Sequence, residues 1–448
     1  MASRMRTMTS GWVALTIAMA ATAACGGGDE IGPPKVTPPQ VGGDDPRFTV
    51  DGVAPWYLVG NAATPGATAI DVAVTVPADE PVEVVDAWVA GGPGQRLTRD
   101  PATGRFVGTL AIDHLAAGEH EVLFASDGKD VALARRVFKR THPLYVILST
   151  DWDFSDPGDA ALLYHDRIRE LHPTVRFTHF VGPYAFTDPD VTEARKAALT
   201  TWLTTRRDQY DDEIGLHIHP WCHFVTTAGL TCITDQSTVY ASDPTGYTIK
   251  LEAYGQAGFE ALLTRADELF VGRGLGKPVT FRAGGWTASI DTLKALAAKG
   301  YIADTSANNW ARMEEWIDVE SGELYRWNMT NWQSIGDTSQ PYYPNVSDKL
   351  SGAAPHVAIL EVPDNAIMVD YVTRAEMIEI FGKNWDGTAL AEPRTFMMGF
   401  HPSSSMTSDE FYRVNGILDH SDRFLASDHA GPVVYAVLKE MPSVWPQP

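Results

Sequence analysis

The chain has 448 residues, of which 44% are hydrophobic and 21% are charged. This composition is that of a globular protein with a sizeable core, and it excludes a disordered chain or a coiled coil. The 57 acidic residues outnumber the 35 basic residues, so the net charge is −22, which argues against nucleic acid or another polyanion as a partner.

The first 24 residues have the features of a signal peptide. Arg4 and Arg6 precede an apolar run at residues 12–21, which is too short for a membrane span, and small residues follow. Residues 22–26 resemble a bacterial lipobox, which predicts a lipid anchor on Cys25. Simple cleavage near this point is the alternative. In either case we expect an exported protein of the bacterial cell envelope, in the periplasm or at the outer membrane, which meets a membrane only through its anchor.

Residues 25–46 are predicted to form a flexible tether behind the anchor. From Gly26 to Pro46, 11 of 21 residues are Gly or Pro, and no apolar periodicity is present. Beyond this segment the cysteines are Cys222 and Cys232. In an oxidising compartment such a pair predicts one local disulfide, with two buried free thiols as the alternative.

Residues 47–141 show a period of two, which is typical of half-buried β-strands. The alternating segments cover residues 69–76, 82–89, 105–110 and 118–125. Turn residues, such as the Gly-Gly-Pro-Gly run at 91–94, separate them. The number and length of these segments predict an immunoglobulin-like β-sandwich.

Residues 142–448 alternate apolar strands with amphipathic helices, which predicts parallel βα units. The expected strands are 144–150, 175–181, 213–219, 279–283, 301–304, 358–362 and 395–401. The expected helices include 159–171, 192–206, 259–271, 290–299 and 374–381. Seven strands favour an incomplete (β/α) barrel. An open doubly wound sheet is the alternative, but residues 149–153 are not the glycine-rich phosphate loop that it requires after its first strand.

Polar residues gather at the carboxyl ends of these expected strands, which is the face where βα-barrels place active sites. They are Asp151 and Asp153 on the first strand, His217 and His219 on the third, Arg282 on the fourth, Asp304 on the fifth and His401 on the seventh.

The pair His217 and His219 suits metal binding, because alternate residues of a strand point to the same side. His223 reaches the same place only if the chain turns helical after Pro220. An aspartate from the first strand would supply a third ligand and leave positions open for water and substrate. This pattern is that of a hydrolytic zinc site.

Four segments resemble the motifs of the polysaccharide deacetylases, a family of metal-dependent carbohydrate esterases that includes chitooligosaccharide deacetylases. The segments are 149–153, with an Asp-x-Asp form, 213–221, with the His-x-His-Pro form of a divergent branch, 281–286 and 399–402. They occur in the family's order, and the resemblance extends over the whole expected barrel.

The resemblance implies a role for each residue. Asp151 corresponds to the catalytic base, Arg282 to the residue that orients it, and His401 to the general acid. The metal ligands correspond to Asp153, His217 and His219, with His223 as the alternative ligand because the family's spacing of four is met between His219 and His223. Gly284-Gly285 replaces the family's Pro-Tyr. Asp304 or Asn309 occupies the place of the acidic residue that tunes the general acid.

The expected activity is metal-dependent removal of acetyl groups from an N- or O-acetylated glycan or a peptidoglycan-type substrate, with zinc as the expected cofactor. Trp221 and Trp286 are the candidate sugar-binding residues, because sugar rings stack on aromatic faces. Two alternatives remain open: an amidohydrolase that acts on a small non-sugar amide, and a lipoprotein that binds glycans without turning them over.

Overall fold

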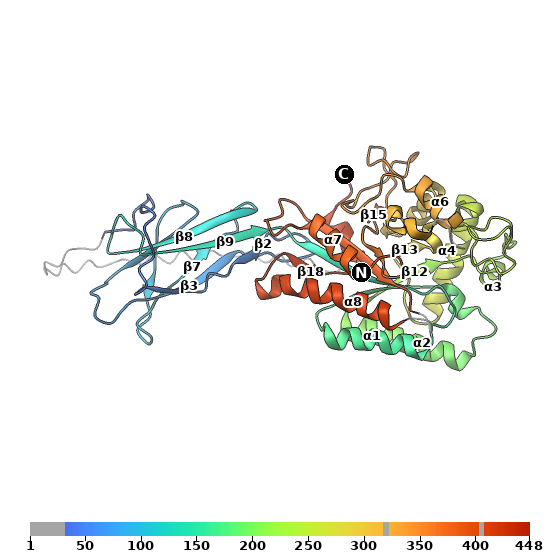
Figure 1. Ribbon diagram of the computed structural model, residues 1–448, viewed down its shortest axis with the longest axis horizontal. Coiled ribbons are helices and arrows are strands. Elements are labelled where there is room, and N and C mark those ends of the chain that lie inside the picture. The colour runs from blue at the N-terminus through green and yellow to red at the C-terminus, as the bar shows by residue number, and fades with distance from the viewer. Residues whose placement is uncertain (1–31, 317–321, 403–406) are drawn as a thin grey trace, which may run out of the picture.

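The computed structural model describes residues 32–316, 322–402 and 407–448. Figure 1 shows an elongated molecule, with a β-sandwich at one end and a domain of strands and helices at the other. The predicted signal peptide at residues 1–24 and Cys25 lie outside the described residues. Among the described residues, no helix combines the length and the apolar character that crossing a bilayer requires.

The first domain consists of two facing sheets. One sheet has the order β1 (Thr49–Asp51), β3 (Ala69–Thr75), β7 (Phe106–Ala111), β6 (Thr98–Arg99), and the other has the order β2 (Trp56–Leu58), β9 (Ala134–Thr141), β8 (Gly118–Ser126), β4 (Val85–Val89), β5 (Gln95–Arg96). Alternate side chains of β3, Ile70, Val72 and Val74, are buried against the opposite sheet. The domain is therefore a β-sandwich, and its immunoglobulin-like topology stays a prediction.

The segment from residue 32 to residue 46, which was expected to be a flexible tether, makes hydrogen bonds to the β-sandwich. The amide of Gln40 donates to Asp130 O at 2.7 Å, that of Asp45 donates to Leu133 O at 2.8 Å, and Lys35 O accepts from Trp88 Nε1 at 3.0 Å. Backbone hydrogen bonds need no apolar side chains, so the lack of hydrophobic periodicity did not prevent this segment from lying along the sandwich.

The second domain is built on one curled sheet in which all pairings are parallel. Its strands are β10 (Leu144–Asp151), β11 (Phe177–Val181), β12 (Glu213–Ile218), β13 (Thr280–Ala283), β14 (Ala303–Asp304), β15 (Leu360–Glu361), β16 (Ile367–Met368), β17 (Arg394–Phe400) and β18 (Val433–Tyr435). The order is β15-β14-β13-β12-β11-β10-β17-β16, and β18 pairs with the first half of β10. Within the described residues β15 and β16 do not pair, so the barrel is open between them.

The expected count of seven strands is wrong, because this sheet has nine. The two additional strands, β16 and β18, contain two and three residues. Neither of these two segments lies within an expected strand.

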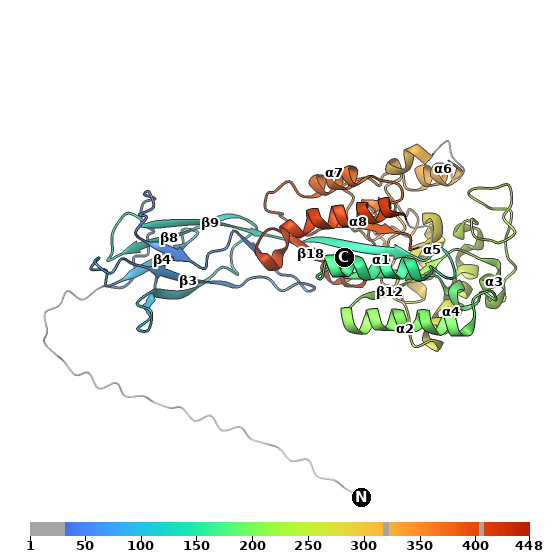
Figure 2. The same cartoon turned by 60° about the horizontal axis from the view of Figure 1, so that its bottom comes forward.

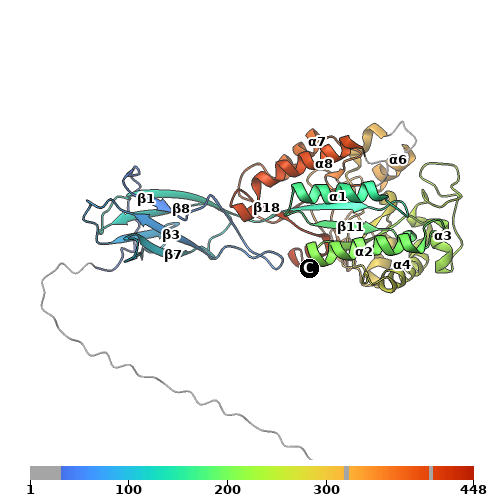
Figure 3. The ribbon, with the colours of Figure 1, turned by 90° about the horizontal axis from the view of Figure 1, so that it is seen from below.

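Helices cover the sheet, so that all eight residues of β10 are buried. The helices are α1 (Asp159–Leu171), α2 (Glu193–Tyr210), α3 (Cys222–Val225), α4 (Gly255–Gly272), α5 (Ile290–Ala298), α6 (Gly322–Asn331), α7 (Arg374–Asn384), α8 (Ser408–Ser421) and α9 (Met441–Val444). Figures 2 and 3 show α8, α1 and α2 side by side along one flank of the domain.

The two domains meet at the amino ends of the barrel strands. β9 ends at Thr141 and β10 begins at Leu144, so only two residues join the domains. Across the junction the ring of Trp56 packs against Trp385 with a centroid separation of 5.8 Å, and Lys139 Nζ donates to Gly387 O at 3.0 Å. The carboxyl ends of the barrel strands therefore face away from the sandwich.

Candidate metal centre and active site

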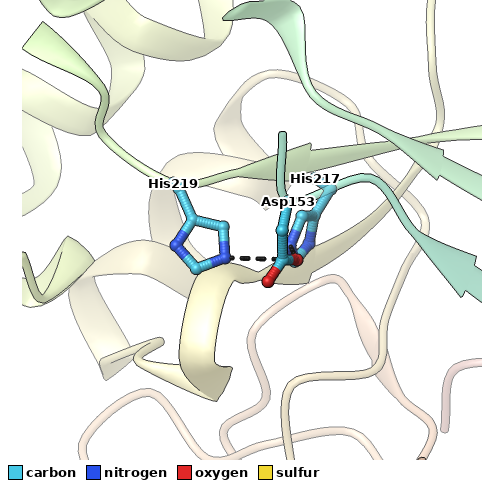
Figure 4. Close-up of side chains that lie close together, drawn as sticks. All are labelled: Asp153, His217 and His219. Carbon is cyan, nitrogen blue, oxygen red and sulfur yellow. Dashed lines mark hydrogen bonds and ion pairs between the residues drawn. The ribbon is translucent and has the colours of Figure 1, made fainter. Parts of the chain in front are cut away.

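The carboxyl ends of two strands, β10 and β12, bring three candidate ligands together. Asp153 follows the end of β10, His217 lies on β12 and His219 directly follows that strand. Asp153 Oδ1 is 3.1 Å from His217 Nε2 and 3.4 Å from His219 Nε2. One ligand atom from each residue lies within 4.8 Å of the other two. Figure 4 shows both imidazole rings turned toward the carboxylate.

Hydrogen bonds on the far side of each ring fix which nitrogen faces the carboxylate. His217 Nδ1 lies 2.9 Å from Arg282 O, and His219 Nδ1 lies 2.8 Å from Tyr247 O. A carbonyl oxygen only accepts hydrogen bonds, so each Nδ1 must carry the proton. In the neutral rings each Nε2 then presents a lone pair toward Asp153 Oδ1.

Two lone pairs and a carboxylate oxygen repel one another unless positive charge lies between them. A divalent ion satisfies all three, and the donor set of two imidazole nitrogens and one carboxylate oxygen is one that zinc accepts. Zinc bonds of 2.0–2.1 Å in a tetrahedron place neighbouring ligand atoms about 3.3 Å apart, close to the observed 3.1 Å and 3.4 Å. The residues present therefore fit a zinc-type ion.

The electrostatics of Asp153 agree with a cation site. Burial alone would raise the pKa of its carboxyl, but the positive charge of the neighbouring His401 imidazole holds that pKa well below its ordinary value. Asp153 therefore stays an anion, which is the form that binds a metal ion.

Asp151, the last residue of β10, is paired with a buried arginine. Arg282 Nη1, on β13, lies 3.1 Å from Asp151 Oδ1 and also donates to Ser149 Oγ at 2.8 Å. Arg282 Nη2 lies 3.3 Å from Asp364 Oδ2. A single guanidinium thus contacts two buried carboxylates, and Asp151 also lines the pocket.

Asp364 has a strongly perturbed carboxyl. Burial raises its pKa to about 6, although Arg282 opposes the shift. Its Oδ2 also accepts a hydrogen bond from Trp286 Nε1 at 3.1 Å. Asp364 therefore holds both Arg282 and Trp286 in position behind the pocket.

His401 directly follows β17 and lines the same pocket as the two other histidines. Its Nδ1 is 2.9 Å from Asp370 Oδ2, and its Nε2 is 3.8 Å from Asp153 Oδ1. Burial opposes its positive charge, but Asp370 and Asp153 together raise the pKa of His401 to about 10. The Nδ1 contact fixes the ring so that Nε2 faces the pocket.

The structure brings His219 into this cluster and leaves His223 outside it. The chain does turn helical after Pro220, but α3 directs His223 toward Thr187, with His223 Nδ1 3.0 Å from Thr187 Oγ1. Asp304 also lies elsewhere: it hydrogen-bonds Ser306 and lies beside Glu361 on β15. Asp370, and not Asp304 or Asn309, contacts the candidate general acid.

The two candidate sugar-binding tryptophans have different surroundings. Trp221 is half-buried, and its Nε1 donates to Asp153 O at 3.1 Å. Trp286 lines the pocket but is only 3% exposed. Beside Trp221, the structure joins Cys222 to Cys232 in a disulfide. The predicted lipidation site at Cys25 lies outside the described residues.

The candidate base, the candidate metal ligands and the candidate acid line one pocket of about 120 Å³ at the carboxyl ends of the strands. Its lining includes Asp151, Asp153, His217, His219, His401, Tyr247, Tyr371 and Trp286. A carboxylate and a histidine next to a cation site can together move protons during hydrolysis of a carbonyl compound.

Sequence reasoning missed the partners that hold these groups. Asp364 follows β15 and was visible as an acidic residue near a strand end, but no motif gave it a role. Asp370 follows β16, a strand that the sequence did not reveal. Tyr247 lies in the irregular segment between α3 and α4, where no periodicity places a side chain.

No protein-family model and no curated protein sequence matches the chain. Solved structures do match it, and they include members of the family that the sequence motifs resemble. A Mycobacterium smegmatis protein described as a polysaccharide deacetylase matches with 15% identity and a TM-score of 0.39, over 67% of this chain and 88% of its own. A family 4 carbohydrate esterase from Streptomyces lividans, in complex with acetate, matches with 11% identity and a TM-score of 0.32, over 68% and 96%.

A polysaccharide deacetylase from Bacillus cereus matches with 10% identity and a TM-score of 0.23, over 59% of this chain and 89% of its own. At these identities and TM-scores, the function has to be argued from the residues of the site.

Proposed function

We propose that this protein is a metal-dependent hydrolase that removes acetyl groups from an N- or O-acetylated glycan. One observation carries the proposal: Asp153 Oδ1 and the Nε2 atoms of His217 and His219 converge on one point. The same pocket holds the pair of Asp151 with Arg282 and the pair of His401 with Asp370. Metal-dependent hydrolysis of an acyl group requires a metal site with a base and an acid beside it, and this pocket contains candidates for all three.

Asp153, His217 and His219 would hold the ion, which we propose to be zinc. When bound, such an ion supplies Lewis-acid chemistry, which makes water nucleophilic near neutral pH and polarises a carbonyl group. Asp151 acts as the base and accepts a proton from the attacking water. Arg282 orients Asp151 by its 3.1 Å contact.

His401 completes the reaction from the opposite side. Its Nδ1 is held by Asp370, so a proton on Nε2 is directed into the pocket. Donation of this proton to the departing amine or alcohol avoids expulsion of a strongly basic anion. For an amide this step is essential, because the free amide anion is a very poor leaving group.

Aromatic side chains at the pocket support a sugar as the substrate. Phe154 is 48% exposed and stacks on Tyr247, which in turn stacks on Trp221. Such a face suits the apolar side of a sugar ring. We further propose that the protein is exported to the bacterial cell envelope and held there by a lipid on Cys25.

Acetate release is the direct test. The purified chain should be loaded with zinc and assayed on acetylated chitooligosaccharides, peptidoglycan, acetylated xylan and simple acetamides. We expect release from a glycan, loss of activity on chelation and recovery on addition of zinc. Asp153→Ala and His217→Ala should lose both the metal and the activity.

Asp151→Asn is the matched variant, since it removes the base but none of the metal ligands. It should still bind zinc while kcat falls by about 10²- to 10⁴-fold. Acetate release that survives both chelation and Asp153→Ala would overturn the proposal. Turnover restricted to small acetamides would instead point to a non-sugar amidohydrolase, and saccharide binding without any turnover would point to a binding protein.

A further inference from the structure

Tyr247 contacts two of the three candidate ligands at once. Its hydroxyl donates to Asp153 Oδ2 at 2.7 Å, and its carbonyl oxygen accepts from His219 Nδ1 at 2.8 Å. Its ring also lies over the imidazole of His219, with a centroid separation of 4.4 Å. None of the motifs in the sequence includes this residue.

Because of the contact with Tyr247, the two carboxylate oxygens of Asp153 have different partners. Oδ1 faces His217 Nε2 and His219 Nε2, whereas Oδ2 accepts a hydrogen bond from the Tyr247 hydroxyl. A carboxylate whose second oxygen is engaged in this way cannot turn to bind an ion through both oxygens without breaking that hydrogen bond.

We propose that Tyr247 is a positioning residue that makes Asp153 a one-oxygen ligand and so keeps coordination positions free for water and substrate. The inference rests on the metal site of the proposed function. Catalytic zinc sites need such open positions, and the groups that hydrogen-bond to metal ligands set both their orientation and the metal affinity.

The segment around Tyr247 is itself held firmly in place. Asp243 accepts hydrogen bonds from the amides of Thr245 and Thr248, which closes a tight turn. The amide of Cys222 donates to Thr245 O at 2.8 Å, so this turn is fixed to the chain just after His219. Gly246 has a φ of 83° and packs against Pro220, where a side chain would clash.

The test compares Tyr247→Phe with the wild type. This variant keeps the ring and the backbone carbonyl and removes only the hydroxyl that contacts Asp153. Tyr254→Phe is the matched control: Tyr254 accepts a hydrogen bond from the amide of Ile233, next to Cys232, and its hydroxyl supports the same region without touching the metal site. Zinc affinity is measured by competition with a chelator, and the visible spectrum is recorded with cobalt(II) in place of zinc.

We expect Tyr247→Phe to bind zinc about 10- to 100-fold more weakly. Its cobalt bands should also lose intensity, because Oδ2 becomes a ligand and the coordination number rises. Tyr254→Phe should match the wild type in both measurements.

If Tyr247→Phe had the zinc affinity and the cobalt spectrum of the wild type, this inference would be overturned, but the proposed function would not. An equal change in Tyr254→Phe would also overturn it, because loosening of the segment would then explain the effect. A wild-type chain that binds neither ion would overturn the metal site of the proposed function and this inference with it.

Discussion

At the scale of single residues, hydrogen bonds decide which atom of each side chain faces the pocket. The Nδ1 atoms of His217, His219 and His401 are each engaged by an oxygen behind the ring. Two of these oxygens belong to the backbone and one to Asp370. The three Nε2 atoms are therefore presented toward the carboxylate of Asp153 before any ion or substrate binds.

Asp370→Ala tests the partner of the candidate acid. The variant leaves His401 without the contact that orients its ring, so we expect kcat to fall by about 10²- to 10³-fold. Zinc affinity should stay within a few-fold of the wild type, because the carboxylate of Asp370 pairs with His401 and not with a candidate metal ligand. Both quantities can be measured on the same zinc-loaded preparation.

The matched variant is His401→Ala, which should show the same loss, and the double variant should be no worse than either single one. Additive losses in the double variant would contradict the coupling of Asp370 to His401. A large loss of zinc from Asp370→Ala would show that Asp370 belongs to the metal site instead.

At the scale of elements, the strands that carry the site could be predicted from sequence because they are continuous apolar runs that end in polar residues. The expectation for α1 agrees with its bounds, Asp159–Leu171, and the expected strand 213–219 contains β12. α6 and α8 were not predicted. α8 contains Asn415 and Gly416 at its centre, which weaken the helical pattern although Thr407 and Glu410 form a capping box at its start.

α1 also carries a buried histidine that makes the fold sensitive to acid. His165 Nδ1 donates to Ala161 O at 3.0 Å, and the ring packs among Phe177, Trp202 and Phe400. Burial lowers the pKa of His165 to about 3. In the unfolded chain His165 becomes protonated below about pH 6.5, whereas in the folded chain it stays neutral down to about pH 3. The free energy of unfolding therefore falls as the pH falls from about 6.5 to about 3.

His165→Phe should remove this sensitivity. Between pH 7 and pH 5 the wild type should lose about 2 kcal/mol more free energy of unfolding than the variant, as measured by urea denaturation. His114→Gln, which changes an exposed histidine of the sandwich, serves as the control. Equal losses in the wild type and in His165→Phe would contradict the assignment.

At the scale of the whole molecule, the sandwich and the pocket lie at opposite ends of the barrel strands. Lys35 and Gln40 contact the end of the sandwich that is remote from Thr141, and α3, which follows the metal ligands, lies at the far end of the molecule in every view (Figures 1, 2 and 3). A pocket in this position can meet a polymer without obstruction by the sandwich.

The sequence placed Asp151, Asp153, His217, Arg282 and His401 at strand ends, where the structure has them, because strand periodicity and strand ends are local properties; the roles of these residues stay predictions. It left His219 and His223 as alternatives and did not find Tyr247 or Asp370. The positions of these side chains depend on how a short helix, an irregular loop and a two-residue strand pack, and none of these leaves a periodic pattern.

Anomalous diffraction at the zinc edge, on crystals of the zinc-loaded protein, tests the central claim most directly. The account predicts one strong peak per chain within bonding distance of Asp153 Oδ1, His217 Nε2 and His219 Nε2, with the Oδ2 atom of Asp153 still bound to Tyr247. A peak that involves His223, a peak elsewhere or no peak in the presence of excess zinc would contradict it.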